Sequence, residues 1–248
     1  MIDRSFDLLD ALADGDRSLT EICRTTGLSK GTAFRLLAGL AVRGLVIKDP
    51  IGSTYMLGPG ILKLVESALT GIGSVATLGR SALEELSMVT SETVALHVQS
   101  GLDRVVIDEI PSQHSIRYAS IAGSVAPIHV GASGVVLLAF KPEDQLERTL
   151  SLLAATVENL DYPSLETNVR RAQHYGWALS VGERVDGAIG ISVPVLSKTL
   201  LLSLNVLGPA SRLAVEDLEA FLPQMRATAA HLASLIDGPS HPRIYVNS

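Results

Sequence analysis

The run GLSKGTAFRLLAGLAVRGLV, from Gly27 to Val46, constrains the fold of this chain more than any other stretch. Gly27 can adopt a positive φ and turn the chain after a short predicted helix over residues 19–26. Ser29 stands where a hydroxyl caps the next helix. That helix has one apolar face at the spacing i, i+3, i+4, i+7, formed by Ala33, Leu36, Leu37 and Leu40. The pattern predicts a helix-turn-helix.

The opposite face of the second helix is small, polar and singly basic, with Gly31, Arg35, Ala38 and Val42 pointing outward and Thr32 beside them. Such a face enters a DNA major groove without steric conflict. The chain has a net charge of −6, yet it holds no acidic residue between Glu21 and Asp49. Cations in this stretch can neutralise phosphates, which is the main source of non-specific DNA affinity. We therefore predict that this region binds DNA.

Two short strands follow, over residues 45–48 and 54–57, with a turn at residues 49–53. They predict a wing, so residues 1–58 are interpreted as a winged helix-turn-helix domain. Its first helix, over residues 2–13, is expected to place Ile2, Phe6, Leu9 and Ala13 toward the core, with Leu8 and Leu12 beside them. The predicted DNA-binding residues of the domain are Arg24, Ser29, Lys30, Gly31, Thr32, Arg35, Arg43, Lys48, Ser53 and Thr54.

Composition limits the remaining possibilities. A length of 248 residues suits two domains, and 47% hydrophobic content allows packed cores. Aromatic residues make up 4%, so stacking platforms for single-stranded nucleic acid are not expected. The single cysteine, Cys23, excludes an internal disulfide framework and a multi-cysteine zinc site. No stretch is long and apolar enough to span a bilayer, and the N-terminus does not resemble a signal peptide. We expect a soluble, cytoplasmic protein with no membrane partner.

The pattern changes after Gly58-Pro59-Gly60. Residues 59–73 are predicted to form a linker whose helix, residues 61–70, is apolar around more than half its circumference. Such a helix packs between domains or against a partner subunit, which predicts self-association. Residues 74–238 alternate runs of strands with flanking helices, which indicates an α+β domain with one antiparallel sheet. The expected strands cover residues 93–99, 104–110, 117–121, 177–181, 188–195 and 199–207. The expected helices cover residues 75–89, 134–140, 142–154, 165–175 and 215–236, before a tail at residues 239–248.

Enzyme chemistry has little support in the sequence. Residues 131–134, Gly-Ala-Ser-Gly, are similar to a nucleophile elbow, but Val135 stands where that motif requires glycine. His97 and His129 lack an ordered serine and acid partner, and we interpret His129 as a hydrogen-bonded structural residue. The histidines show no metal-binding spacing, and the glycine-rich stretches lack nucleotide-binding patterns. No metal, cofactor or catalytic residue is predicted.

Three segments in order resemble the IclR family of bacterial transcriptional regulators. They are residues 27–46 with YMLGPGILKL after them, PIHVGASGVVLLAF at residues 127–140, and GWALSVGERVDGAIGISVPV at residues 176–195 followed by LNVLGPASRL. The resemblance implies a winged helix-turn-helix, a linker helix and a GAF-like effector-binding domain. It also implies dimers joined through the DNA-binding domains, often paired into tetramers. Such a protein would regulate transcription, with catabolic genes as the expected targets and either repression or activation as the outcome.

The resemblance also places an effector site in the C-terminal domain. Its predicted residues are Ala132, Ser133, Ser180, Gly190, Asn205 and Leu207. The amides of residues 131–133 precede a helix and can hold an anion. We expect an apolar cavity, enclosed by Val135 and Leu207, whose one fixed charge is Glu183 at the rim. These features favour a carboxylate effector with an apolar or aromatic body.

This chain departs from the family pattern at three places. Val135 replaces a usual lysine, Ser180 stands where some relatives have an acid, and the hairpin between Val195 and Leu200 is about two residues shorter. Two alternatives remain open. One is a hydrolase or other enzyme in the C-terminal domain, and the other is a winged-helix protein whose basic face contacts protein or whose C-terminal domain serves assembly only.

Overall fold

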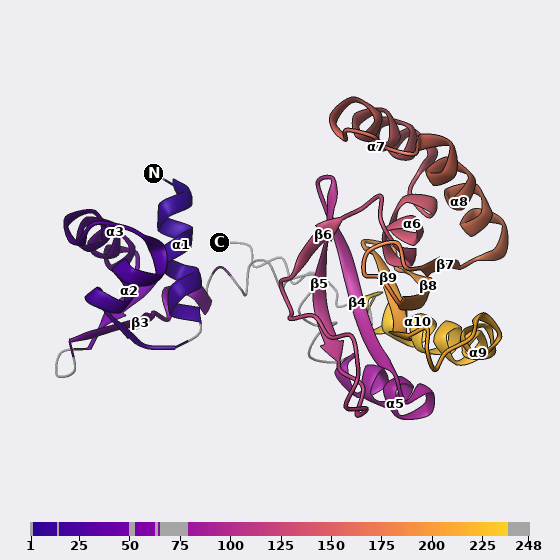
Figure 1. Cartoon of the computed structure of the whole chain (residues 1–248), viewed down its shortest axis with the longest axis horizontal. Coiled ribbons are helices and arrows are strands. Elements are labelled where there is room, and N and C mark those ends of the chain that lie inside the picture. The colour runs from indigo at the N-terminus through magenta and orange to yellow at the C-terminus, as the bar shows by residue number, and fades with distance from the viewer. Residues whose placement is uncertain (1, 14, 50–52, 63, 65–78, 238–248) are drawn as a thin grey trace, which may run out of the picture. The chain divides into compact units, whose positions relative to one another are not determined.

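The computed structural model describes residues 2–13, 15–49, 53–62, 64 and 79–237 (Figure 1). The chain divides into two compact units, Met1–Thr70 and Gly71–Ser248, and each is described by itself. Among the described helices, none is long and apolar enough to cross a membrane. The predicted linker helix over residues 61–70 falls almost wholly outside the described residues, and so does the predicted tail.

The first unit is a winged helix. Three helices pack around one core, and three strands pair in the order β1-β3-β2 (Figure 1). The elements are α1 (Ile2–Ala13), β1 (Arg17–Ser18), α2 (Leu19–Thr26), α3 (Lys30–Val42), β2 (Val46–Lys48) and β3 (Thr54–Leu57). The pairing of β1 with β3 adds a strand to the wing that the sequence analysis did not predict.

Local sequence signals set the helix boundaries of this unit. Gly27 ends α2 with a φ of 69°, and the Ser29 hydroxyl accepts a hydrogen bond from the Thr32 amide at 3.4 Å. At the start of α2, Ser18 and Glu21 form a reciprocal capping box. The structure therefore confirms the predicted helix-turn-helix, and the capping box is an additional finding.

The predicted core side of α1 was right for its leucines and wrong for three other residues. Leu8 and Leu12 are buried and Leu9 packs against the core, whereas Ile2 and Phe6 are 73% and 60% exposed and Ala13 is also exposed. Apolar residues lie on both sides of this helix, so the periodicity alone does not select one side. The packing of α1 against α2 and α3 selects the side with the closely spaced leucines, which contact Ile22 and Leu37 in one core cluster.

The second unit is built on a six-stranded antiparallel sheet in the order β6-β5-β4-β9-β8-β7. Its strands are β4 (Thr93–Ser100), β5 (Asp103–Ile110), β6 (Val125–Pro127), β7 (Ala178–Val181), β8 (Ala188–Leu196) and β9 (Leu201–Pro209). Its helices are α5 (Arg80–Thr90), α6 (Ala132–Ala139), α7 (Glu143–Thr156), α8 (Tyr162–Tyr175), α9 (Val215–Ala220) and α10 (Leu222–Asp237). The α+β class with an antiparallel sheet is confirmed.

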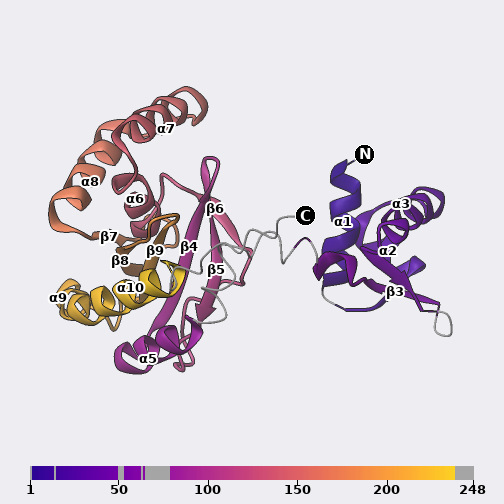
Figure 2. The same cartoon turned by 180° about the vertical axis from the view of Figure 1, so that it is seen from behind.

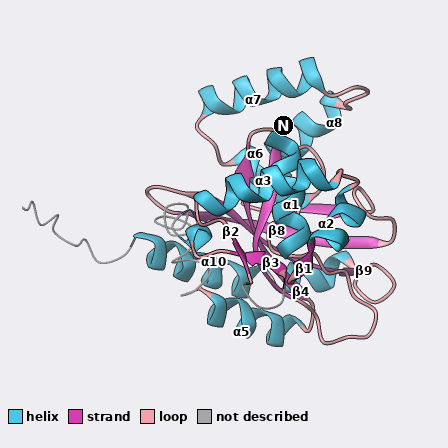
Figure 3. Cartoon of the chain, turned by 90° about the vertical axis from the view of Figure 1, so that its left-hand side faces the viewer, coloured by secondary structure: helices cyan, strands magenta, loops and turns pink. Residues whose placement is uncertain are grey.

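Helices cover the two faces of this sheet differently. The α5 and α10 helices pack on one face, where alternate strand residues such as Leu96, Ile191 and Leu204 form an aliphatic core with them. Helix α6 contacts the strands β4, β8 and β9 and forms a second core with α7 and α8. Figure 3 shows α7 and α8 on one side of the strands and α5 and α10 on the other, and Figure 2 shows the same layers from behind.

Two predicted elements of this unit were wrong. Residues 117–121 form no strand, because side chains satisfy their backbone instead: Thr93 donates to the Tyr118 carbonyl and the Ser120 amide donates to Glu109. The edge strand is β6, a few residues later. The last helix is two helices that meet at Phe221, since Pro223 lacks the amide hydrogen that would continue the first helix.

Candidate DNA-binding face and ligand cavity

The outward face of α3 has the composition that the sequence predicts. Gly31, Arg35, Ala38 and Val42 are exposed, and Thr32 is half-buried beside them. Arg35 Nε donates to the Gly31 carbonyl at 3.3 Å, so the start of the guanidinium lies against the preceding turn of the helix. Ser29 donates its hydroxyl hydrogen to Thr32 Oγ1 at 3.0 Å while it caps the helix. The N-terminal turn of α3 therefore presents ordered polar groups to solvent.

The remaining predicted DNA contacts lie on neighbouring elements. Arg24 lies in the last turn of α2, Lys30 begins α3, and Arg43 directly follows that helix. Lys48 ends β2, where its ammonium lies 6.0 Å from the centre of the Tyr55 ring. Thr54 begins β3, and Ser53 directly precedes it with a φ of 56°. Helix α3 and the wing thus carry eight of the ten residues, and Arg24 and Arg43 flank α3 in the sequence.

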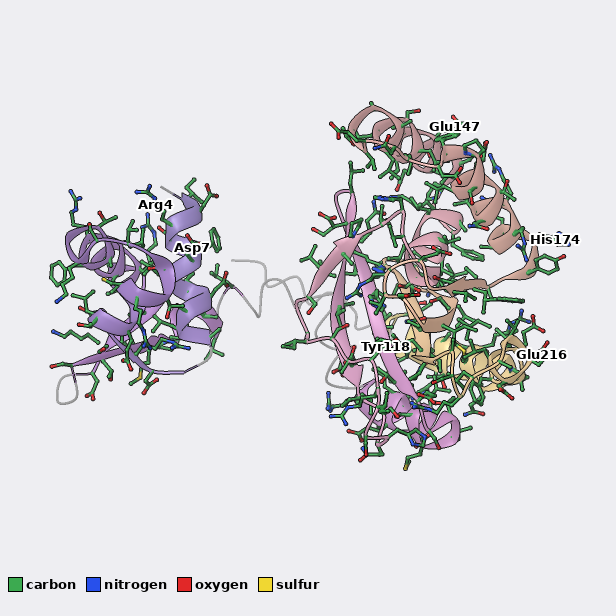
Figure 4. All side chains as sticks on the ribbon, in the orientation of Figure 1. Arg4, Asp7, Tyr118, Glu147, His174 and Glu216 are labelled. Atoms are coloured by element: carbon green, nitrogen blue, oxygen red, sulfur yellow. The ribbon has the colours of Figure 1, made fainter. Side chains whose placement is uncertain are left out.

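One basic residue escaped the sequence analysis. A groove between α1 and α3 is lined by Asp3, Arg4, Thr32, Arg35 and Leu36. Arg4, which is labelled in Figure 4, therefore lines the same groove as Thr32 and Arg35, two of the predicted DNA-binding residues. Nothing in the local sequence around residue 4 indicates this placement, since it depends on how α1 crosses α3.

In the second unit, one cavity of about 110 Å³ is lined by all six predicted effector residues. They come from three separate places: Ala132 and Ser133 begin α6, Ser180 and Gly190 are paired on β7 and β8, and Asn205 and Leu207 lie on β9. At Gly190, a Cβ atom would lie 3.2 Å from Leu207 Cβ and 3.4 Å from Asn205 Oδ1, so a side chain there would crowd the cavity.

The cavity is far more charged than the sequence analysis predicted. Besides Glu183, it is lined by ionisable residues on strands and loops that the analysis did not assign to it: His97, Arg104, Glu109, Tyr118 and Arg184. The expectation of an aliphatic cavity with one rim charge was therefore wrong. Val135 was also misplaced, since it packs in the core formed by α6, α7 and α8 and does not line the cavity.

Arg104 is the central feature of the cavity. Its side chain is buried, with 4% of the residue exposed, and Nε donates to Ser133 Oγ at 2.9 Å. Its Nη1 is buried without a hydrogen-bond partner among the described residues. Burial and the nearby Arg184 lower the pKa of Arg104 to about 10, so the guanidinium is still charged at neutral pH. A buried N–H group without an acceptor costs stability, which makes Nη1 a candidate ligand contact.

A bulge in β5 brings two of its ionisable residues, Arg104 and Glu109, to the same face. Ala95 pairs with Glu109 and Leu96 with Asp108, but His97 pairs with Val106, so Ile107 is the additional residue. Strand residues normally alternate between faces, which would place Arg104 and Glu109 on opposite sides. Because the register shifts by one residue between them, both line the cavity, and Asp108 faces α5, where it accepts a hydrogen bond from Arg80.

The N-terminus of α6 forms the other charged part of the site. Gly131 precedes the helix with a φ of 83°, a conformation that favours glycine, and its amide donates to Glu183 Oε2 at 2.8 Å. A Cβ atom on Gly131 would lie 3.3 Å from Arg104 Nη2. The lack of a side chain therefore lets the guanidinium approach the helix N-terminus, where backbone amides attract anions.

Burial also governs the other ionisable groups. It lowers the pKa of His97 to about 3 and raises the pKa of Glu109, whose carboxylate also accepts hydrogen bonds from Ser120. The interpretation of His129 as hydrogen-bonded was wrong at one ring nitrogen: its Nδ1 is buried without a partner among the described residues. Among those residues, no group of three metal-ligating side chains occurs.

Family models match both units. Residues 1–50 match the IclR helix-turn-helix domain, and residues 70–234 match the bacterial transcriptional regulator IclR C-terminal domain. The chain is 30% identical over 236 residues to the probable transcriptional regulator SauR of Cupriavidus necator, covering 91% of this chain and 92% of that one. It is also 30% identical to the glycerol operon regulatory protein of Streptomyces griseus, over 86% of this chain and 85% of that protein.

A solved structure shares the fold. An IclR homologue from Microbacterium hydrocarbonoxydans, crystallised with 4-hydroxybenzoate, superposes with a TM-score of 0.71 at 20% identity. The match covers 95% of this chain and 98% of that one. At this identity the likeness establishes the common fold.

Proposed function

The chain belongs to the IclR family of bacterial transcriptional regulators, and from this premise we propose that it controls catabolic genes in response to a small organic carboxylate. As a member of the family, it has a DNA-binding helix-turn-helix domain and an effector-binding C-terminal domain. Control of catabolic genes is supported by the relative named as a glycerol operon regulator. Repression and activation are both compatible with the proposal.

The observation that carries the proposal is the unpaired Nη1 of the buried Arg104. A carboxylate in the cavity would supply the acceptor that Nη1 lacks and a negative charge in direct contact with the guanidinium. Ser133 Oγ and the N-terminus of α6 lie at the same place, and Asn205 offers an amide from β9. The aliphatic residues Ala95, Ile189 and Leu207 complete the lining and suit an apolar or aromatic body. The 4-hydroxybenzoate in the Microbacterium homologue is a ligand of this chemical class.

A carboxylate effector predicts a direct binding test. We expect benzoate or 4-hydroxybenzoate to raise the thermal transition of the protein, while benzamide, its neutral isostere, raises it much less. Arg104→Met should abolish the difference between the acid and the amide. Ser133→Trp should fill the site and remove the response of DNA binding, while the winged helix stays folded. If acids and amides stabilise the wild type equally, the carboxylate effector is excluded.

Operator DNA and a second copy of the chain are the other proposed partners. A single winged helix offers a small interface, so a dimer that doubles the contact is expected. The exposed Leu62 and Leu64, at 62% and 59%, support self-association near the end of the first unit. The double variant Leu64→Glu and Leu69→Glu should give monomers with weak operator affinity. A monomeric wild type in light scattering at micromolar concentration would contradict this part of the proposal.

The hydrolase alternative is not favoured. Ser133, its candidate nucleophile, has its hydroxyl oxygen bonded to a guanidinium, which cannot accept the hydroxyl proton as a general base would. His97 also lines the cavity, but burial makes it a very weak base. A test for esterase turnover by the full chain would detect this alternative.

A further inference from the structure

The carboxylate of Glu183 already occupies one anion position of the cavity. It accepts the Gly131 amide hydrogen at 2.8 Å at the N-terminus of α6. We propose that Glu183 is a resident stand-in for the effector carboxylate, and that an effector of this class binds by displacing it from the Gly131 amide. This inference rests on the proposed function and concerns the specificity of the same site.

The geometry places the stand-in beside the unpaired cation. Arg104 Nη2 lies 3.3 Å from the position of a Cβ on Gly131, so the guanidinium and the Gly131 amide border one small space. Glu183 satisfies the amide, but it forms no ion pair with Arg104 among the described residues, and Arg104 Nη1 keeps its free hydrogens. A small carboxylate that enters the cavity can contact both groups. The Glu183 carboxylate accepts a hydrogen bond from the amide and none from Arg104 among the described residues, so it is the more weakly held of the two anions at this place.

The loop is built so that Glu183 can move without loss of the sheet. Residues 182–187 are exposed and connect β7 with β8. Gly182 and Gly187 both have positive φ, at 69° and 74°, and the Gly182 amide donates to the Ala188 carbonyl at 2.8 Å, which closes the loop at its base. Displacement of Glu183 therefore changes a side chain and a short loop, while the paired strands keep their register.

Displacement of Glu183 would also affect the cavity residues Tyr118 and Ser120. Tyr118 Oη donates to the Asp186 carbonyl at 3.0 Å, which ties the loop to the segment that carries Tyr118 and Ser120. Arg184, the residue after Glu183, lines the cavity as well. An effector that releases Glu183 thus acts on the 182–187 loop and on the segment that carries Tyr118. A neutral ligand leaves the Glu183 carboxylate at the Gly131 amide. Specificity for acids over amides then has two sources, Arg104 and the exchange at Gly131.

The experiment measures how removal of the stand-in changes affinity for an acid and for its neutral isostere. We expect Glu183→Ala to bind benzoate roughly fivefold more tightly than the wild type, from the strength of one partly exposed charge-assisted hydrogen bond. Benzamide affinity should change by less than twofold. Asp186→Asn is the matched control, because it removes the same charge from the same loop without a side-chain bond to Gly131. It should change benzoate affinity by less than twofold.

The outcomes separate this inference from the proposed function. Tighter benzoate binding by Glu183→Ala, with Asp186→Asn near the wild type, supports the stand-in. Equal gains in both variants mean that long-range charge is responsible and overturn it, as does unchanged or weaker binding by Glu183→Ala. If benzoate and 4-hydroxybenzoate bind neither the wild type nor Glu183→Ala, the carboxylate effector itself fails. Titration calorimetry on the full-length chain measures all of these values.

Discussion

The two units of the chain differ in how far apart in the sequence their candidate functional residues lie. In the winged helix the candidate DNA contacts lie within residues 24–54, and most of them are exposed on α3 and the wing. In the second unit the cavity collects residues from position 95 to position 207, on strands, loops and the start of one helix. A surface that reads DNA is assembled from local sequence around a separate core. A cavity that binds a small molecule shares its residues with the core, so its chemistry and its stability are coupled.

The largest effect should come from the small core of the winged helix. Leu37 is fully buried there, so Leu37→Ala should cost about 3–5 kcal/mol, which is most of the stability of a domain of this size. Circular dichroism should show early loss of helix, while the fluorescence of Trp177 in the second unit and benzoate binding stay unchanged. Phe34→Ala, on the exposed side of α3, is the matched control. A joint transition of both units would show that they are not independent.

The second effect tests the ion pair next to residues 116–120, a segment whose residues 118–120 line the cavity. Glu92 is 2% exposed and accepts two hydrogen bonds from Arg212, at 2.6 and 2.8 Å, and Arg212 also donates to the Ile116 carbonyl. Glu92→Ala leaves a partly buried cation without its partner and should cost about 2–3 kcal/mol. Urea unfolding followed by Trp177 fluorescence measures the change.

The exposed ion pair between Glu143 and Arg170 provides the control for this test. Glu143→Ala should cost less than about 1 kcal/mol, because solvent screens exposed pairs. Similar losses of stability in Glu92→Ala and Glu143→Ala would mean that the Glu92–Arg212 pair does not hold residues 116–120 in place.

A third effect concerns pH and is confined to the cavity unit. Burial lowers the pKa of His97 to about 3 in the folded state, whereas the unfolded chain binds a proton below about pH 6.5. Above pH 6.5 the imidazole is neutral in both states, so it does not make the free energy of unfolding depend on pH. As the pH falls from 6.5 toward 3, protonation of the unfolded chain lowers the free energy of unfolding. Between pH 7 and pH 5, His97→Gln should therefore lose about 2 kcal/mol less stability than the wild type. Urea midpoints at both pH values test this, with His174→Gln on the exposed face of α8 as the control.

The smallest effects are expected on the DNA-binding face, where substitutions should change recognition and leave folding intact. Arg35→Ala should cost about 1–2 kcal/mol at one preferred base pair, because a bidentate contact to guanine is lost. Lys48→Ala should weaken binding to all DNA sequences alike. It should also reduce the slope of log affinity against log salt concentration by about one. Fluorescence anisotropy at several salt concentrations separates the two, and Lys198→Ala in the second unit should change neither. Unchanged affinity and sequence preference in Arg35→Ala would contradict the placement of the recognition helix.

The sequence predicted the parts of the fold that local signals control. Gly27, Ser29 and the apolar spacing of α3 identified the helix-turn-helix, and the runs of strands with flanking helices indicated the antiparallel sheet. The family resemblance indicated the six predicted effector residues, all of which line the cavity. It did not predict the charge of that cavity. Arg104 lies in β5, and no local sequence pattern reveals that its guanidinium approaches Gly131.

The amino-acid sequence by itself therefore determined which helices and most strands form, because capping, turns and hydrophobic spacing act over a few residues. Tertiary structure decided which side of α1 is buried, because apolar residues lie on both sides. It also decided that Arg104 and Glu109 share a face, because the bulge at Ile107 depends on pairing with β4. The contact between Glu183 and Gly131 joins residues 52 positions apart. Such contacts exist only once distant segments have packed, and they give the cavity its charge.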